Sequence, residues 1–325
     1  MRAKQAGFNL VELMIALVIG LVLMVSITTM FVDTKVSANR SSTVSNLQQQ
    51  AQLALQVLVE DVRAIGSFAE FSGEIITDLP NIVPGKCNIV STVTGAKSEN
   101  YHHPEYANWI FSFKAASAAS AAITANVITD APCLEKDHSM TEQSDVLSIS
   151  RIRGAIIPTA SVNAKSYHVA ITPMQAKLFT GVTPNIANAE IYPYLHHTYF
   201  VQAHATDGTK LSRFSFIDGN FSNDLVVSNI EQIRIDFGVD TNGDGRPESY
   251  FASSNITDLM WRTNQLVSAR IYVLARAKNK DLTLNNDEAF NDKFEPFSPP
   301  NNDNYRRFLL STTVVIKNNM MAVTQ

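Results

Sequence analysis

A short acidic segment near residue 240 has the residue types and the spacing of a calcium-binding loop. Oxygen-bearing side chains alternate along it at Asp240, Asn242 and Asp244, and a Gly follows. The first half of an EF-hand loop has this pattern, in which oxygen ligands surround a hard cation. Glu248 supplies a later carboxylate, but Phe251 occupies the place of the usual bidentate Glu. The sequence therefore leaves open either a calcium site or an ordinary turn rich in Asp, Asn and Gly.

Histidine pairs are a second pattern that could bind a metal. The chain has seven histidines, including His102-His103 and His196-His197, with His204 nearby. Adjacent residues of a strand point to opposite faces, so neither pair is expected to share one ion. We expect these histidines in surface or turn positions. The chain also lacks the Gly-x-Ser-x-Gly, Walker, dinucleotide-binding, Cys-x-x-Cys and His-Glu-x-x-His motifs, and we do not expect an enzyme.

A third pattern lies at the N-terminus, where a short basic leader precedes a long apolar run. The run begins at a Gly7-Phe8 junction and continues to about Val32. It holds roughly 25 residues, and an α-helix needs ~20 to cross a bilayer. Glu12 is the only carboxylate within it. A charge inside a spanning helix costs roughly 2.5–3.5 kcal/mol on insertion scales, so Glu12 is expected to be functional.

This N-terminal segment closely resembles the class III signal of type IV prepilins and pseudopilins. The resemblance implies that a prepilin peptidase cuts between Gly7 and Phe8 and methylates the new N-terminal Phe. Glu12 then takes the fifth mature position, where the family carries a Glu thought to pair with the N-terminal amine of a neighbouring subunit. Such pairing recovers part of the cost of burying each charge.

Two alternatives use the same residues. A secretory signal peptide also has a basic start and an apolar core, and Val36-Ser37-Ala38 has the small residues of a cleavage site. It would be a long leader with Glu12 inside its core. An ordinary single-pass anchor explains the apolar run. It leaves Gly7-Phe8 and Glu12 without a role.

Charge and cysteine content fit an exported protein. The chain has 325 residues, 45% of them hydrophobic, and a formal net charge of −4, so it lacks the basic footprint of a general nucleic-acid binder. The basic leader keeps the N-terminus cytoplasmic and places the remainder across the membrane. Export to an oxidising compartment favours a disulfide between Cys87 and Cys133 over two buried free thiols.

The apolar run continues into a second helical pattern. Apolar residues recur every three or four positions along one stripe, at Leu47, Ala51, Leu55, Leu58, Val62 and Ile65. No Pro or Gly interrupts residues 34–46, and Gly66 is suited to end the helix. The pattern predicts one helix from about Phe8 to Ile65, with its second half packed on a globular domain.

The remaining chain predicts β-structure. Strand-like runs lie at 146–152, 167–172, 198–202, 211–217, 230–237, 266–274 and 309–316. Alternation of Ile233, Ile235 and Phe237 with Arg234 and Asp236 is typical of a half-buried antiparallel strand. We expect an α+β, type IV pilin-like fold, with a long N-terminal helix packed on an antiparallel sheet.

Four divisions of the chain follow from these patterns. We expect a prepilin leader at 1–7, a transmembrane or filament-core half-helix at 8–32, an amphipathic half-helix at 33–66 and a periplasmic β-rich head at 67–325.

Several segments also resemble PilW-type minor pilins. Asn229–Asp240 ends in Gly-Val-Asp before an Asp/Gly-rich turn, Trp261 with Val267–Arg276 resembles the penultimate strand, and Arg306–Asn318 resembles the closing strand. Asp61–Gly66 matches the end of the family's first helix. Many relatives have a Cys soon after that Gly, which this chain lacks. PilW-type proteins are themselves similar to J-type minor pseudopilins of type II secretion.

The resemblance implies a structural role and not an enzymatic one. The chain would be a single-pass inner-membrane protein that, after cleavage by prepilin peptidase, joins other minor pilins and the major pilin at the inner-membrane assembly platform. It would prime, and tip, a type IV pilus. The alternatives are a minor pseudopilin of type II secretion, or an adhesin or DNA-capture pilin that binds through its head. A calcium ion is the one cofactor the sequence suggests.

Overall fold

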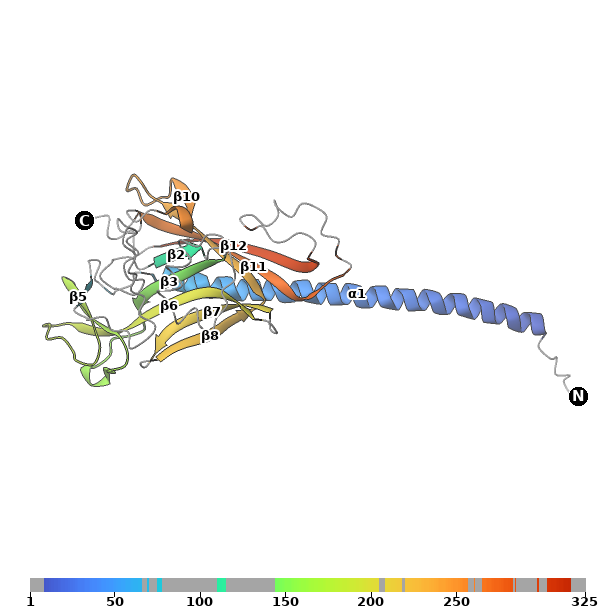
Figure 1. Cartoon of the computed structure of the whole chain (residues 1–325), viewed down its shortest axis with the longest axis horizontal. Helices are drawn as coiled ribbons and strands as arrows, with labels where there is room; N and C mark the ends of the chain where they lie inside the picture. Colours follow the sequence, from blue (N-terminus) through green and yellow to red (C-terminus); the bar gives the residue numbers. More distant parts are fainter. Residues whose placement is uncertain are drawn as a thin grey trace, which may run out of the picture. The chain divides into compact units, whose positions relative to one another are not determined.

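The computed structural model describes residues 9–65, 69, 75–77, 110–114, 144–204, 208–217, 220–256, 260, 265–282, 284, 297 and 303–316. The chain divides into two compact units, Met1–Asn46 and Leu47–Gln325, of which the second is called the head below. One helix, α1 (Leu10–Arg63), contributes to both units (Figure 1). The single long helix predicted from the sequence is therefore confirmed.

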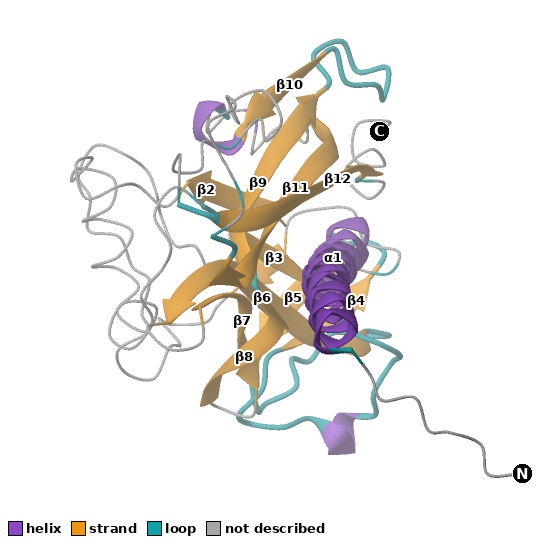
Figure 2. Cartoon of the chain, turned by 90° about the vertical axis from the view of Figure 1, so that its right-hand side faces the viewer, coloured by secondary structure: helices purple, strands orange, loops and turns teal. Residues whose placement is uncertain are grey.

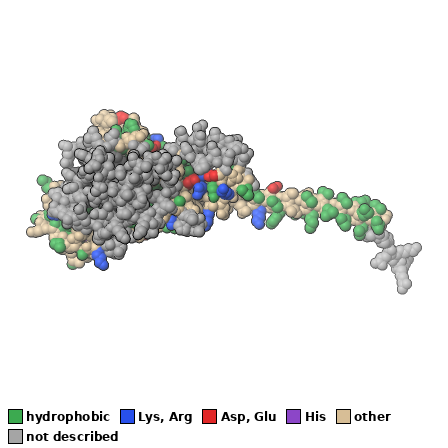
Figure 3. Space-filling model, viewed as in Figure 1, with side chains coloured by type: hydrophobic (Ala, Val, Ile, Leu, Met, Phe, Trp, Pro, Cys, Tyr) green, Lys and Arg blue, Asp and Glu red, His purple; other side chains and the backbone are tan. Residues whose placement is uncertain are grey.

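The first unit is an apolar helix that satisfies its own polar groups. Every Leu, Ile, Val, Met and Phe side chain from Leu10 to Val32 is more than half exposed, and Figure 3 shows hydrophobic side chains along this segment. Hydroxyl groups donate to carbonyls three or four residues earlier at 2.7–3.0 Å, from Ser26, Thr28, Thr29, Thr34 and Thr43. Internal bonding of this kind suits a helix in hydrocarbon, where water cannot satisfy polar groups.

An eight-stranded sheet forms the larger β-layer of the head (Figure 2). Its central path runs β1-β5-β4-β6-β3-β2, and β7 pairs with β6 and β8. All pairs are antiparallel except β1 with β5, which is parallel. The strands are β1 (Ile75–Thr77), β2 (Ile110–Lys114), β3 (Asp145–Ile152), β4 (His168–Thr172), β5 (Gln175–Phe179), β6 (Glu190–His204), β7 (Gly208–Ile217) and β8 (Asn220–Ser228).

A four-stranded antiparallel sheet completes the head. Its order is β10-β9-β11-β12, with β9 (Ile230–Val239), β10 (Ser249–Ala252), β11 (Leu266–Lys280) and β12 (Tyr305–Val315). Two single turns of 3-10 helix, η1 (Thr159–Ser161) and η2 (Ser253–Asn255), lie between strands. A long helix with antiparallel sheets confirms the predicted α+β class.

The main core joins the second half of α1 to strands of both sheets. The buried helix stripe contributes Leu47, Ala51, Ala54, Leu55, Leu58, Val62 and Ile65. Tyr199 and Val201 of β6 and Ile233 and Ile235 of β9 belong to the same buried cluster. The helical stripe predicted from apolar spacing is therefore the face that the sheets cover.

All seven predicted strand runs overlap strands, but β1, β2, β5, β8 and β10 were not predicted. β6 is also longer than its predicted run, because it begins at Glu190 and includes Pro193. Proline cannot donate to a ladder and usually marks a strand end or edge. Here its carbonyl accepts the Arg153 N–H at 2.8 Å, so the strand continues through it.

A single residue, Asn229, carries the chain from the eight-stranded sheet to the four-stranded sheet. It lies between β8 and β9 with φ of 62°, a conformation that Asn tolerates better than most residues. Its N–H donates to the Thr209 carbonyl at 2.7 Å, and its carbonyl accepts the Arg276 N–H at 2.9 Å. The two sheets are thus connected through both backbone groups of one corner residue.

Candidate functional site

The predicted processing and assembly residues lie at the start of α1. Gly7 and Phe8 fall outside the described residues. Glu12 is exposed in the first turn of α1, and its N–H donates to the Asn9 carbonyl at 3.0 Å. A carboxylate in the first turn also faces the positive end of the helix dipole. The structure thus presents one acidic side chain on an otherwise apolar helical surface.

Cys87 and Cys133 also lie outside the described residues. Their disulfide therefore stays a prediction.

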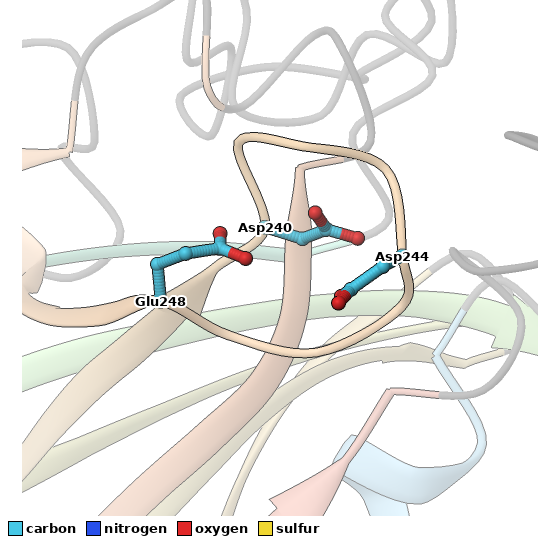
Figure 4. Close-up of side chains that lie close together, drawn as sticks. All are labelled: Asp240, Asp244 and Glu248. Carbon is cyan, nitrogen blue, oxygen red and sulfur yellow. The ribbon is translucent and has the colours of Figure 1, made fainter.

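The predicted calcium loop connects β9 to β10 and brings its three carboxylates together (Figure 4). Ligand oxygens of Asp240, Asp244 and Glu248 all lie within 4.8 Å of one another. Asn242 uses its Oδ1 to accept the Asp244 N–H at 2.8 Å. A cluster of this size has the oxygen chemistry that a hard cation prefers, although exposed acidic groups also gather without one.

The loop is also held by hydrogen bonds of its own. Asp240 accepts the N–H groups of Asn242 and Gly243 at Oδ1 (3.1 and 2.6 Å) and of Gly245 at Oδ2 (2.7 Å). Desolvation raises the pKa of Asp240, but these backbone hydrogen bonds outweigh it and lower the pKa overall. Glu248 Oε2 accepts the Thr241 N–H at 2.7 Å. The geometry therefore fits an Asx-rich turn as well as an ion site, and calcium stays a prediction.

A buried network that sequence reasoning missed ties the end of α1 to the eight-stranded sheet. Asp61 is 5% exposed. Its Oδ1 accepts Nε and Nη2 of Arg151 on β3 at 3.2 and 2.8 Å. Its Oδ2 lies 2.6 Å from His197 Nδ1 and accepts the Tyr199 hydroxyl at 2.5 Å, both from β6. One helix carboxylate is thus bonded to two strands.

The partners of Asp61 fix its charge. Desolvation raises the pKa of Asp61, but hydrogen bonds from His197 and Tyr199, the nearby His197 charge and the Arg151 bond hold it well below its usual range. The carboxylate can only accept hydrogen bonds, so His197 carries its proton on Nδ1. Burial and the charge of Asp61 in turn raise the pKa of Tyr199. Asp61 therefore stays ionised at neutral pH, and the Tyr199 hydroxyl keeps its proton.

The same network includes residue types of a hydrolytic triad without its geometry. Ser215 on β7 is the cross-strand partner of His197. No described residue hydrogen-bonds its Oγ, and Ser215 is only 2% exposed. A nucleophile must be bonded to its base and accessible to substrate. Asp61, His197 and Ser215 therefore do not form a nucleophilic site in this structure.

The expectation that the histidines lie in surface or turn positions was wrong for His168, which is buried on β4, and for His197. Its side chain is 6% exposed and faces Asp61. The structure describes no side chain for His196 or His204, and His102-His103 lie outside the described residues. A signal for the network was present in the sequence, because Asp61 falls on the same helical face as Leu58 and Val62. A charge on a buried face requires a partner.

Comparisons with known proteins show what the two ends of this chain are similar to. A model of the prokaryotic N-terminal methylation motif matches residues 2–28, which include the start of α1 and Glu12. α1 is also the one helix among the described residues that is long and apolar enough to cross a membrane. These features make the N-terminal part of the chain similar to that of type IV pilins, with a helix suited to membrane anchoring.

The second match falls on the head. The model described as Type IV Pilus-assembly protein W matches residues 198–318, from within β6 through β12. The resemblance to PilW-type minor pilins is therefore confirmed, and it relates the chain to structural components of pili. A solved type IV-like pilin from Thermus thermophilus matches with 11% identity and a TM-score of 0.25, covering 56% of this chain and 82% of that one. No curated protein matches the chain.

Proposed function

We propose that this protein is a minor pilin that is cut between Gly7 and Phe8, joins other pilins in the inner membrane, and primes assembly of a type IV pilus that it then tips. The observation that carries the proposal is the apolar first part of α1 with Glu12 as its single acid, within a matched methylation motif.

The exposed apolar surface of α1 requires a covering. Side chains from Leu10 to Val32 are more than half exposed, and the burial of apolar area is the main favourable term in association. Lipid covers this surface before assembly, and helices of other pilins cover it in a filament. The basic leader favours a cytoplasmic N-terminus, which leaves the head in the periplasm.

Glu12 would fix the axial offset between the helices of neighbouring subunits. A buried carboxylate is costly unless a cation meets it. Cleavage after Gly7 creates a cation, the amine of Phe8, at the end of each subunit. Pairing the amine of one subunit with Glu12 of the next would favour one axial offset between helices. A large head and the PilW match favour a minor component that starts or ends a filament.

The test is intact-mass and N-terminal analysis of the membrane-extracted protein, together with pilus counts. We expect a wild-type chain beginning at methylated Phe8. Gly7→Ala should retain the leader and leave few or no pili. Gly20→Ala is a matched control in the same helix, because nothing lies within 4 Å of the Cβ it would add. It should be processed normally.

Other outcomes assign other functions. A wild-type chain that still begins at Met1, or that begins at Asn39, with normal piliation in Gly7→Ala, would rule out the minor-pilin proposal. A third outcome is a wild-type chain that begins at methylated Phe8, together with a Gly7→Ala variant that has normal pili but fails to secrete proteins. That outcome would assign the chain to type II secretion instead.

A further inference from the structure

The two sheets of the head meet where the start of β3 reaches β9 (Figure 2). The Ile233 N–H donates to Ser144 Oγ at 3.0 Å, and the Ile235 N–H donates to Asp145 Oδ2 at 2.8 Å. β10 pairs with β9 only from Asp236 onward. The side chains of Ser144, just before β3, and Asp145, at its start, thus satisfy amides of β9 that no described strand reaches.

The carboxyl of Asp145 is poorly satisfied for a buried acid. It is 1% exposed, and among the described residues its Oδ1 receives no hydrogen bond. Within the described part of the chain, the cation paired with Oδ1 is Arg234 Nη1, at 3.6 Å, and Arg234 Nε has no hydrogen-bond partner there. A buried carboxylate with one amide donor, the nearby Ser253 hydroxyl and one distant guanidinium recovers only part of its desolvation cost.

We propose that Asp145 is a proton-operated latch between the two sheets: the neutral carboxyl stays bonded to β9, and its ionisation weakens the junction. The neutral group keeps a carbonyl oxygen that accepts the Ile235 N–H, and it does not require a buried charge. The ionised group gains stability by admitting water or by moving away from β9, either of which loosens the contact.

The charged groups around Asp145 come from several elements. Arg234 and Asp236 lie on β9, with opposite effects on the carboxyl, and the Ser253 hydroxyl comes from η2. Lys114 of β2 is the cross-strand partner of Asp145 in register. Burial raises the pKa of Asp145 to about 6, and the Arg234 charge, the Ile235 N–H and Ser253 lower it only in part.

The direction of the pH effect follows from this shift. The ordinary pKa is 3.8 and the folded value is about 6, so the folded protein binds the proton more tightly than the unfolded chain. The stabilisation is fully present below pH 3.8 and is lost as pH rises through 6. A difference of about two units corresponds to roughly a 100-fold change in the unfolding equilibrium constant.

The test compares denaturant unfolding of the full-length protein in detergent micelles with that of Asp145→Asn, from pH 4 to 7.5. We expect the unfolding constant of the wild type to rise up to roughly 100-fold relative to the variant, with a midpoint near 6. Ser144→Ala is a matched control, because it removes the neighbouring amide bond without a titrating group. Its deficit should be the same at each pH.

Two further measurements keep the proposal testable if Asp145→Asn does not fold. The side-chain carboxyl of Asp145 in the wild type should titrate near 6 by carbon NMR, and Ile235 amide protection should fall over the same range. Arg234→Gln should move that titration upward by removing the cation paired with Oδ1. Parallel stability profiles, or a carboxyl that titrates below pH 4, would overturn the latch.

Discussion

Asp61 and Asp145 are both buried and both join one structural layer to another, yet their surroundings favour opposite charge states. Asp61 accepts two bonds from Arg151 and one each from His197 and Tyr199, and its pKa is lowered. Asp145 accepts one described backbone bond, lies 3.6 Å from Arg234, and has its pKa raised to about 6. The number and charge of the donors, together with the deeper burial of Asp145, separate the two acids.

The comparison divides the head into a permanent junction and a pH-dependent one. Asp61 fixes the end of α1 to β3 and β6 throughout the neutral range. Asp145 fixes β3 to β9 best when it is neutral. We expect the helix to stay docked under conditions in which the two sheets have loosened.

The largest expected effect comes from breaking the permanent junction. Asp61→Ala leaves Arg151, His197 and Tyr199 without their common acceptor and should destabilise the head by ~3–5 kcal/mol, the usual range for one removed partner of a buried pair. Denaturant unfolding at neutral pH measures it. Glu60→Ala, on the exposed side of the same turn, should change stability by less than about 0.5 kcal/mol. A loss below about 1 kcal/mol in Asp61→Ala would contradict the network.

The two guanidinium partners provide a matched comparison. Arg151→Gln removes two charge-assisted bonds and should cost about 1.5–3 kcal/mol, whereas Arg234→Gln removes only a 3.6 Å ion pair and should cost less. Equal losses in the two variants, measured at pH 7 by chemical unfolding, would show that the two acids are supported equally.

Lowering the pH should affect the two aspartates differently, because their pKa values are shifted in opposite directions. The pKa of Asp61 is lowered in the folded state, so its stabilisation is present above the unfolded value of 3.8 and is lost as pH falls toward the folded value. The stability gap between the wild type and Asp61→Asn should therefore shrink below pH 4, whereas the gap for Asp145→Asn changes between pH 4 and 7. Stability curves of both variants against the wild type measure this difference, and gaps that move together would refute it.

The smallest effect is expected at a third aspartate, Asp240. Its pKa is lowered like that of Asp61, but here by backbone N–H groups. Asp240→Asn should slightly destabilise the β9–β10 turn, with a wild-type advantage that disappears as pH falls below 3.8. Local amide exchange at Gly243 and Gly245 measures it, with Asp244→Asn as the control. Calorimetry with millimolar calcium distinguishes a calcium site from an ordinary turn. Binding heat that Asp240→Asn abolishes would identify an ion site, and the absence of binding heat in the wild type would identify a turn.

Much of the fold was predictable because its signals are local. The apolar stripe from Leu47 to Ile65 and the alternation around Ile233 depend on spacing within one element. β5 and β10 were missed because they span only Gln175–Phe179 and Ser249–Ala252, too short for a clear pattern. Their strand character comes from pairing with β4 and β9.

The candidate sites divide in the same way. Asp240, Asp244 and Glu248 were predicted together because they lie in one loop. Asp61 and His197 were not, because 136 residues separate them. No spacing rule relates positions that far apart, and only strand pairing brings β6 to the end of α1.

The sequence by itself determined the apolar run, the Gly7-Phe8 junction and the single acid at Glu12. Transfer of a helix into lipid and recognition of a signal both depend on a contiguous segment, so composition and order suffice for them. Only the tertiary structure decided which buried aspartate has its pKa lowered and which has it raised. That outcome depends on donors supplied by distant strands, and their positions exist only once the sheets have formed.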